Sequence, residues 1–228
     1  MNDLYKISKN VEKILNGSQT NFLDSKLQKE VKSKLNKNDY KIYLPYKESE
    51  KVIFYTKDKP NVLLYEIKSK NKLLHQEIMG TFFLLGIDPS CYGDILIIDN
   101  HYYIYILDTI EKYLITNLDK IKNNKVELIK KDINLLNDYK REYESIELIV
   151  SSNRLDTIIS TLIHTSRDNI KTKIKDKKIL VNYDYPKTSY TLKENDIFSI
   201  RRYGKYKYRG ITNTTKKNHI VVKIDKYM

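Results

Sequence analysis

The sequence has no tryptophan, a single cysteine, four prolines and six glycines among its 228 residues. With Cys91 alone, no disulfide can form within the chain, and such cysteine usage is typical of a reducing compartment. The stretch after Met1 lacks the apolar segment of a secretory signal, and no apolar run approaches the ~18 residues that a membrane span requires. These absences predict a soluble, cytoplasmic protein that does not interact with a membrane.

Little in the composition favours chemistry at a cofactor or a metal. The six glycines form no G-x-G cluster, which a methyltransferase-type nucleotide loop would need. His75-Gln76-Glu77 has no second histidine at the helical spacing of a zinc motif. Cys91 has no basic partner in the sequence that would activate its thiol, so we interpret it as a small buried apolar residue. We therefore predict no cofactor, no metal ligand and no catalytic residue.

Positive charge is concentrated in the last third of the chain. The formal net charge is +13, and residues 151–228 hold 18 Lys/Arg against 7 Asp/Glu, whereas residues 1–150 hold 24 against 22. A folded segment with this excess attracts phosphate, because its bases release condensed counterions when they bind it. An anionic membrane surface is the competing partner, but no basic amphipathic helix or lipidation signal supports it. The charge pattern favours nucleic acid.

The hydrophobic periodicity predicts an α+β fold in three units, residues 1–70, 71–150 and 151–228. Asp24 is expected to cap the second helix, and Asp108 to cap the helix that ends at Asn117. The strands over 94–99 and 102–107 are expected to form a hairpin that turns at Asn100-His101. In the first two units we predict helices over 4–15, 24–36, 73–85 and 108–117, and strands over 41–45, 51–56, 62–68, 94–99, 102–107, 126–129 and 146–150.

The third unit is predicted to contain two capped helices before a β-rich tail. Asn153 is a good N-cap for a helix over 154–163, and Ser166 for a helix over 167–175. Apolar residues at helical spacing then face inward from both helices. The expected strands are 179–181, 196–200, 206–209 and 219–224.

The second of these helices carries the first candidate site. Ser166 places a hydroxyl at the helix N-terminus, where free amides and the helix dipole favour a phosphate. Arg167, Lys171 and Lys175 follow on one face, and Arg154 takes the equivalent place in the preceding helix. Two helix starts with an arginine each suit an RNA backbone, and the arginines can also stack on unpaired bases. The alternative is that these bases are an ordinary solvated helix face.

The run from Arg201 to Arg209 alternates bases with aromatics. On a strand of period two, Lys205, Lys207 and Arg209 share one face, and Tyr206 and Tyr208 share the other. This pattern favours a nucleic-acid surface. The alternative is a hairpin edge with tyrosines in the core and lysines in water.

These residues together resemble the S4 RNA-binding domain over about residues 152–200. The matching residues are Arg154-Leu155-Asp156, Ser166-Arg167, Ile170, Ile174, Lys178-Ile179-Leu180-Val181-Asn182, Leu192 and Asp196-Ile197. The family usually has glycine where this chain has Asp176, Tyr183 and Asn195. Asp and Asn tolerate the left-handed conformation best among non-glycine residues, whereas Tyr183 does not fit that pattern.

With the upstream segment H-Q-E-I-M-G-T-F-F-L-L-G-I-D and the extension Arg201-Arg202-Tyr203-Gly204-Lys205, the layout resembles the YlmH family. The resemblance implies a bacterial protein with an N-terminal α+β region and a C-terminal S4 domain, in which two helices pack on a small, mostly antiparallel sheet. It further implies binding to rRNA of the large ribosomal subunit, near tRNA, in ribosome-associated quality control, and a link to cell division. We expect a monomer without DNA specificity, whose middle unit is a second ribosome contact or a protein-binding surface. The predicted RNA-binding residues are Arg154, Thr165, Ser166, Arg167, Lys171, Lys175, Lys178, Asn182, Arg201, Arg202, Lys205, Lys207 and Arg209.

Two other functions compete with a non-catalytic RNA-binding role. Arg154-Leu155-Asp156 also resembles the tripeptide around the catalytic aspartate of pseudouridine synthases, which would make the protein an rRNA-modifying enzyme. Here, however, the tripeptide lies inside the S4 pattern, so we interpret Asp156 as a structural charge that pairs with Arg167 or Lys171. The third possibility is a cell-division adaptor that acts through protein contacts.

Overall fold

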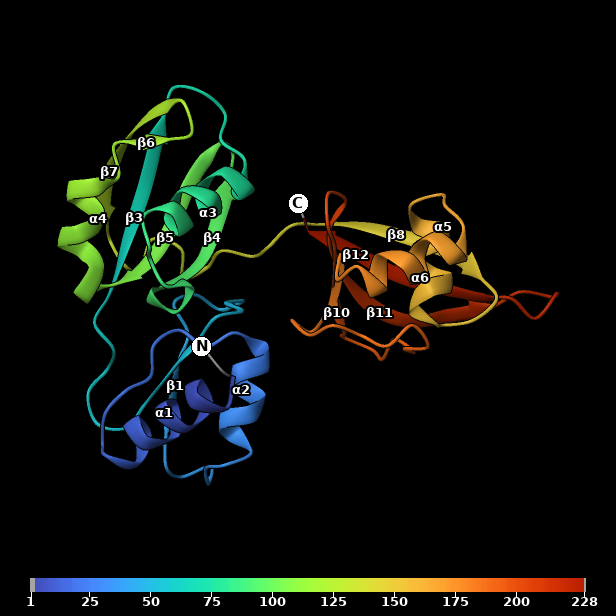
Figure 1. Cartoon of the computed structure of the whole chain (residues 1–228), viewed down its shortest axis with the longest axis horizontal. Helices are drawn as coiled ribbons and strands as arrows, with labels where there is room; N and C mark the ends of the chain where they lie inside the picture. The colour runs from blue at the N-terminus through green and yellow to red at the C-terminus, as the bar shows by residue number, and fades with distance from the viewer. Residues whose placement is uncertain (1–2, 228) are drawn as a thin grey trace. The chain divides into compact units, whose positions relative to one another are not determined.

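A computed structural model describes residues 3–227, which fold as two compact units that divide between Lys140 and Arg141. We call them the N-terminal unit and the C-terminal unit. Figure 1 shows a β-sheet with helices against it in each. No helix within residues 3–227 is long and apolar enough to cross a bilayer.

The N-terminal unit begins with two helices that pack on a short hairpin. Gly17, at a φ of +75°, follows the first helix. The Asp24 carboxylate accepts a hydrogen bond from the Leu27 amide at 2.9 Å, which confirms the predicted cap. Val31 and Phe54 meet in the core of this part. The elements are α1 (Asp3–Leu15), α2 (Ser25–Lys32), β1 (Lys41–Tyr43) and β2 (Ile53–Tyr55).

The rest of this unit is an antiparallel sheet in the order β4-β5-β3-β7-β6. Its central strands are buried on both faces because alternate side chains enter different cores. Ile104 packs with Phe82 of α3, whereas Tyr105, its neighbour in the strand, packs with Phe22 from the first segment. The elements are β3 (Val62–Ser69), α3 (His75–Leu84), the 3₁₀ turn η1 (Pro89–Cys91), β4 (Tyr92–Ile98), β5 (His101–Leu107), the 3₁₀ turn η2 (Asp108–Ile110), α4 (Glu111–Asn117), β6 (Lys120–Ile121) and β7 (Asn124–Lys131).

The boundary predicted near residue 70 does not separate two units in this structure. β3 lies before that boundary, yet it pairs with β5 on one side and β7 on the other. Composition does not change at this point, and strand pairing over this distance leaves no local signal in the sequence.

Two local predictions in this unit were wrong. The β4–β5 turn uses Asp99 and Asn100, both in the left-handed region, because Ile98 pairs with His101. Asp108 does not cap α4 either. It lies in η2, and its carboxylate accepts a hydrogen bond from the Asn61 side chain at 2.7 Å.

The described residues of the C-terminal unit form a five-stranded antiparallel sheet in the order β8-β12-β11-β10-β9. Both helices pack on the same face of it, as Figure 1 shows. Ile158 and Ile170 from the helices meet Phe198, Tyr206 and Tyr208 from the strands in one buried core. The elements are β8 (Tyr143–Val150), α5 (Leu155–Leu162), α6 (Arg167–Lys175), β9 (Ile179–Val181), β10 (Ile197–Ile200), β11 (Gly204–Thr214) and β12 (Ile220–Tyr227).

The first strand of this sheet comes from before the predicted boundary at residue 151. β8 pairs with β12 along its whole length, from Tyr143 opposite Tyr227 to Val150 opposite Ile220. The C-terminal unit therefore starts about ten residues earlier than the change in composition suggests. β11 and β12 are also longer than predicted and form an extended hairpin that contains bulges.

Candidate nucleic-acid interface

Asp156, in the first turn of α5, is completely buried and holds two arginines. Its carboxylate accepts hydrogen bonds from Arg154 at 3.0 and 3.1 Å and from Arg167 at 2.9 and 3.3 Å. The Thr157 amide donates a further bond to it at 3.0 Å. The predicted pairing of Asp156 with Arg167 is confirmed, whereas Lys171 pairs with Asp168 instead. Arg154 and Arg167, which are 13 positions apart in the sequence, therefore share the Asp156 carboxylate.

The electrostatics keep this cluster charged. Burial alone would raise the pKa of Asp156, but the hydrogen bonds and charges of the two arginines outweigh it, so the pKa lies below its usual value. The bond to Asp156 in turn raises the pKa of Arg154. The arginine side chains remain 39% and 47% exposed. Each donates two of its five N–H groups to Asp156.

Arg154 reaches this position from just outside the helix. The predicted N-cap, Asn153, was wrong: the N-cap residue is Arg154, in extended conformation, and its side chain makes no capping bond. Asn153 instead exchanges hydrogen bonds with Leu192 on a neighbouring segment.

The N-terminus of α6 is built as the sequence predicts. The Ser166 hydroxyl accepts a hydrogen bond from the Asn169 amide at 3.2 Å, and the Thr165 hydroxyl accepts one from the Asn169 side chain. Ile170 and Ile174 enter the core, so the outer face of the helix carries Arg167, Lys171 and Lys175. Within residues 3–227, no side-chain bond is recorded for Lys175.

The residues after α6 have structural partners. Lys178 pairs with Asp176 at 2.7 Å. The Asn182 amide group donates to the Asp196 carboxylate at 2.7 Å, and its oxygen accepts from the Ile197 amide at 3.0 Å. Asn182 therefore holds the turn between β9 and β10 in place, and its side chain is occupied in that role.

The left-handed positions of this region differ in part from the predicted ones. Asn195 has a φ of +69° and Tyr183 a φ of +65°, as the pattern indicated. Asp176, however, has a φ of −74°, and the left-handed residue after α6 is Lys177. Arg202, in the turn before β11, is left-handed as well.

The predicted alternation along β11 is confirmed. Tyr206 and Tyr208 are buried, and Tyr206 stacks on Phe198 with ring centroids 5.3 Å apart. These tyrosines are core residues and cannot stack on a base. Lys205, Lys207 and Arg209 lie on the opposite face of the sheet, away from α5 and α6. Arg209 is held there by an ion pair with Asp225.

The predicted site residues consequently fall on two faces of the C-terminal unit. The helix side carries Arg154, Thr165, Ser166, Arg167, Lys171 and Lys175, and we call it the helix face. The opposite side carries Lys205, Lys207 and Arg209, and we call it the sheet face. Arg201 and Arg202 are exposed in the turn between β10 and β11. Three tyrosines of the sheet face, Tyr143, Tyr183 and Tyr227, were missed because strand pairing brings them together from distant segments.

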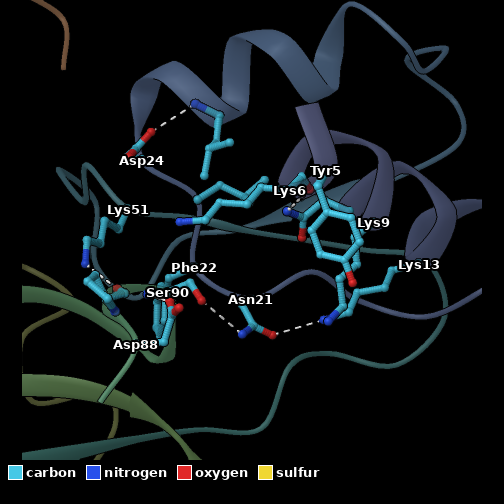
Figure 2. A pocket seen from close by; sticks show the side chains of 14 residues that line it. Tyr5, Lys6, Lys9, Lys13, Asn21, Phe22, Asp24, Lys51, Asp88 and Ser90 are labelled. Carbon is cyan, nitrogen blue, oxygen red and sulfur yellow. Dashed lines mark hydrogen bonds between the residues drawn. The ribbon is translucent and has the colours of Figure 1, made fainter. Parts of the chain in front are cut away.

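A further cluster of bases lines a pocket of about 280 Å³ in the N-terminal unit, shown in Figure 2. Lys6, Lys9 and Lys13 of α1 form one wall, since their spacing places them on one helix face. The Lys13 ammonium donates to the Asn21 side chain at 3.1 Å. Across the pocket, Lys51 donates to the carbonyl oxygens of residues 89 and 92, and burial lowers its pKa to about 8. This pocket could not be predicted from local patterns, because its walls come from four separate segments.

Comparison with known proteins finds a family model and a relative that each match part of this chain. Residues 57–135 match the model of the family described as "Putative RNA-binding domain in YlmH". The ribosome-associated protein quality control protein P2 of Bacillus subtilis (strain 168) is 26% identical over 145 residues, which is 63% of this chain and 56% of the relative. The chain thus matches little more than half the length of that relative.

Among solved structures, the cell division protein ylmH from Streptococcus pneumoniae is similar with a TM-score of 0.49 and 19% identity. The similarity covers 58% of this chain and 90% of that one. Residues 57–135 thus resemble the RNA-binding domain of the YlmH family.

Proposed function

We propose that the chain is a non-catalytic RNA-binding protein that docks on rRNA of the large ribosomal subunit, beside tRNA, in ribosome-associated quality control. In this proposal the C-terminal unit is an S4 RNA-binding domain and the helix face is its rRNA contact. The observation that carries the proposal is the pair of arginines held on buried Asp156 beside the Ser166-capped start of α6. The description of the matched family and the name of the relative support RNA and the ribosome as partners.

The helix face suits a sugar-phosphate backbone for a physical reason. Arginine side chains lose conformational entropy when they bind a phosphate, but Arg154 and Arg167 are already ordered by Asp156. Arg167 is itself in the first turn of α6, where the helix dipole favours an anion. Lys171 and Lys175 extend the same face, so a backbone that runs along α6 meets further positive charge.

The geometry of Asp156 favours this proposal over an rRNA-modifying enzyme. A catalytic aspartate has to reach the reacting base, whereas Asp156 is completely buried and both of its oxygens accept hydrogen bonds from arginines. The residues that match the RNA-binding family model, 57–135, lie wholly in the N-terminal unit. We propose that this region makes a second RNA contact.

Co-sedimentation of the purified chain with large ribosomal subunits at moderate salt tests the helix face. Removing both arginines would leave Asp156 charged and buried without its two cationic partners. The test therefore replaces Arg154 and Arg167 with lysine, which keeps the charge but loses the planar fork. A second variant, Lys175→Glu, reverses one charge on the same face without breaking a recorded contact. We expect both variants to bind subunits roughly tenfold more weakly or worse.

Lys34→Glu is the matched control, since Lys34 is an exposed lysine of the N-terminal unit and undergoes the same change of charge. If both helix-face variants sediment like this control, the helix face is not the interface. An rRNA-modifying enzyme would instead leave a modified nucleotide that mass spectrometry finds in wild-type rRNA and misses in rRNA from deletion cells. A cell-division adaptor would retain a protein partner after nuclease treatment.

A further inference from the structure

The sheet face of the C-terminal unit is an aromatic surface as well as a basic one. Tyr143 of β8 and Tyr227 of β12 lie directly opposite each other in the register. Their rings meet edge to face, with centroids 5.2 Å apart. In the next row, Lys207 lies opposite Asp225. The two tyrosines are only half-buried, whereas the tyrosines on the other face of the sheet are fully covered by the helices.

Cations lie over these rings from three segments. The Lys205 ammonium is 4.8 Å from the centroid of Tyr227 and 5.2 Å from that of Tyr183, and it donates to the Tyr183 hydroxyl at 3.1 Å. The Arg209 guanidinium lies 5.4 Å from the Tyr143 ring. The Arg141 guanidinium lies 5.2 Å from the centroid of the Tyr227 ring. A cation over a tyrosine ring contributes only about 0.5–1 kcal/mol at an exposed site. The stability of the fold is therefore a weak reason for these cations and rings to lie together.

Tyr183 adds an independent observation. Its φ of +65° places a bulky residue in the left-handed region, which costs free energy and is normally left to glycine, Asn or Asp. The conformation directs the ring against Lys205 on the sheet face. Backbone strain that persists at an exposed turn is a reason to look for a function of the side chain.

The charges of the sheet face indicate which partner it suits. Arg141, Lys205, Lys207 and Arg209 gather there, and Asp225 on the same face is paired with Arg209. A surface of this sign repels basic protein segments and attracts phosphate. Flat rings between cations are the arrangement by which proteins bind unpaired nucleotides: bases stack on the rings, and the cations move to the phosphates.

We propose that the sheet face is a second RNA site, which binds unpaired nucleotides by stacking on Tyr143, Tyr183 and Tyr227. This inference rests on the proposed RNA-binding function and divides it between two surfaces. The helix face takes the backbone of structured RNA, and the sheet face takes a single-stranded segment.

Fluorescence anisotropy of the full chain with a labelled single-stranded oligoadenylate and a labelled RNA hairpin separates the two surfaces. Tyr183→Gly removes the ring together with the backbone strain. It should raise the melting temperature or leave it unchanged, while it weakens single-strand binding roughly fivefold or more. Asn195→Gly is the matched control, because Asn195 is an exposed left-handed residue whose side chain makes no recorded bond within residues 3–227. It should change binding to neither probe.

The double variant Tyr143→Leu with Tyr227→Leu tests the ring pair. Leucine keeps the apolar contact between the strands, so we expect a folded protein that binds the single strand at least tenfold more weakly and the hairpin as before. The corresponding double change to phenylalanine keeps the rings and should retain single-strand binding.

Each result decides for or against the inference. Folded leucine and glycine variants that bind the single strand like the wild type would overturn the stacking site. If the wild type sediments with ribosomal subunits but does not bind the single strand, the stacking site fails and the proposed function stands. If it binds neither, the proposed function fails. Tyrosine variants that lose only a nuclease-resistant protein partner would make the sheet face a protein interface instead.

Discussion

Replacing Asp156 with asparagine should destabilise the C-terminal unit more than any other single removal of a charge on the helix face. Asparagine has the same shape, so the core around α5 stays filled. The change removes the acceptor on which Arg154 and Arg167 converge and places amide donors against their N–H groups. Because Asp156 is completely buried, water cannot replace the lost partners on its side.

The magnitude follows from the geometry. Hydrogen bonds to a charged group contribute about 1.5–3 kcal/mol. The arginines are 39% and 47% exposed and recover part of this from water, so we take about 1 kcal/mol for each. A buried donor without a partner costs a further ~1–3 kcal/mol. The expected loss is about 3–5 kcal/mol, which lowers the melting temperature of a unit of this size by roughly 12–40 °C.

Calorimetry or circular dichroism of the full chain measures this loss as a shift in one melting transition. Asp168→Asn is the control, since Asp168 is an exposed acid on α6 that pairs with Lys171, and it should cost less than about 0.5 kcal/mol. A loss for Asp156→Asn as small as that of the control would refute the reasoning. RNA affinity gives a second readout: the variant gains a positive charge yet should bind subunits more weakly, because its arginines are no longer ordered.

The pH dependence of stability should change as well. The folded-state pKa of Asp156 lies below its ordinary value, so its contribution is complete above the unfolded pKa of about 3.9 and disappears as the pH falls through the folded value. The difference in unfolding free energy between the wild type and Asp156→Asn should therefore shrink as the pH falls below about 4.

Three further predictions concern separate parts of the chain. Gly93→Ala should destabilise the protein by about 1–3 kcal/mol, because a methyl group there would approach the Phe22 ring to 3.1 Å. Gly80→Ala, in open space on α3, should instead stabilise it by about 0.5–1 kcal/mol, and denaturant titration measures both changes. Lys177→Gly should stabilise by up to about 1 kcal/mol and Asp176→Gly should not, since only the former residue is left-handed; equal effects in thermal melts would contradict the assignment. The folded-state pKa of Lys51 is about 8, so between about pH 8 and 10.5 the unfolded chain keeps a proton that the folded chain has lost. The unfolding free energy of the wild type should therefore rise over this pH range, and Lys51→Met should lack this rise.

Features with a local cause could be predicted from the sequence. Asp24 and Ser166 cap their helices because the capping bond needs only the next few residues. The alternation of Lys205, Tyr206, Lys207 and Tyr208 across the sheet follows from the period of a strand. The pairing of Asp156 with Arg167 could also be anticipated, since each lies in the first turn of a neighbouring helix.

Features that depend on distant segments could not be predicted. Composition changes at Ser151, but β8 belongs to the later unit because it pairs with β12, which lies 70 or more residues away. The two faces of the C-terminal unit look like one basic stretch in the sequence, because charge says nothing about which side of a sheet a residue occupies. Arg154 was predicted as the first residue of the helix, whereas it lies at the N-cap position and its side chain donates to Asp156.

The pairing of β8 with β12 also determines where this protein can be divided. A fragment that begins at Ser151, where the basic region starts, would lose β8 and expose the full length of β12 as an open edge of alternating apolar residues. Such an edge offers unpaired N–H and C=O groups to another chain and is a site of aggregation. A fragment that begins at Arg141 retains the covering strand. An insoluble product from the shorter fragment would therefore reflect the missing strand, and would give no information about whether this region binds RNA.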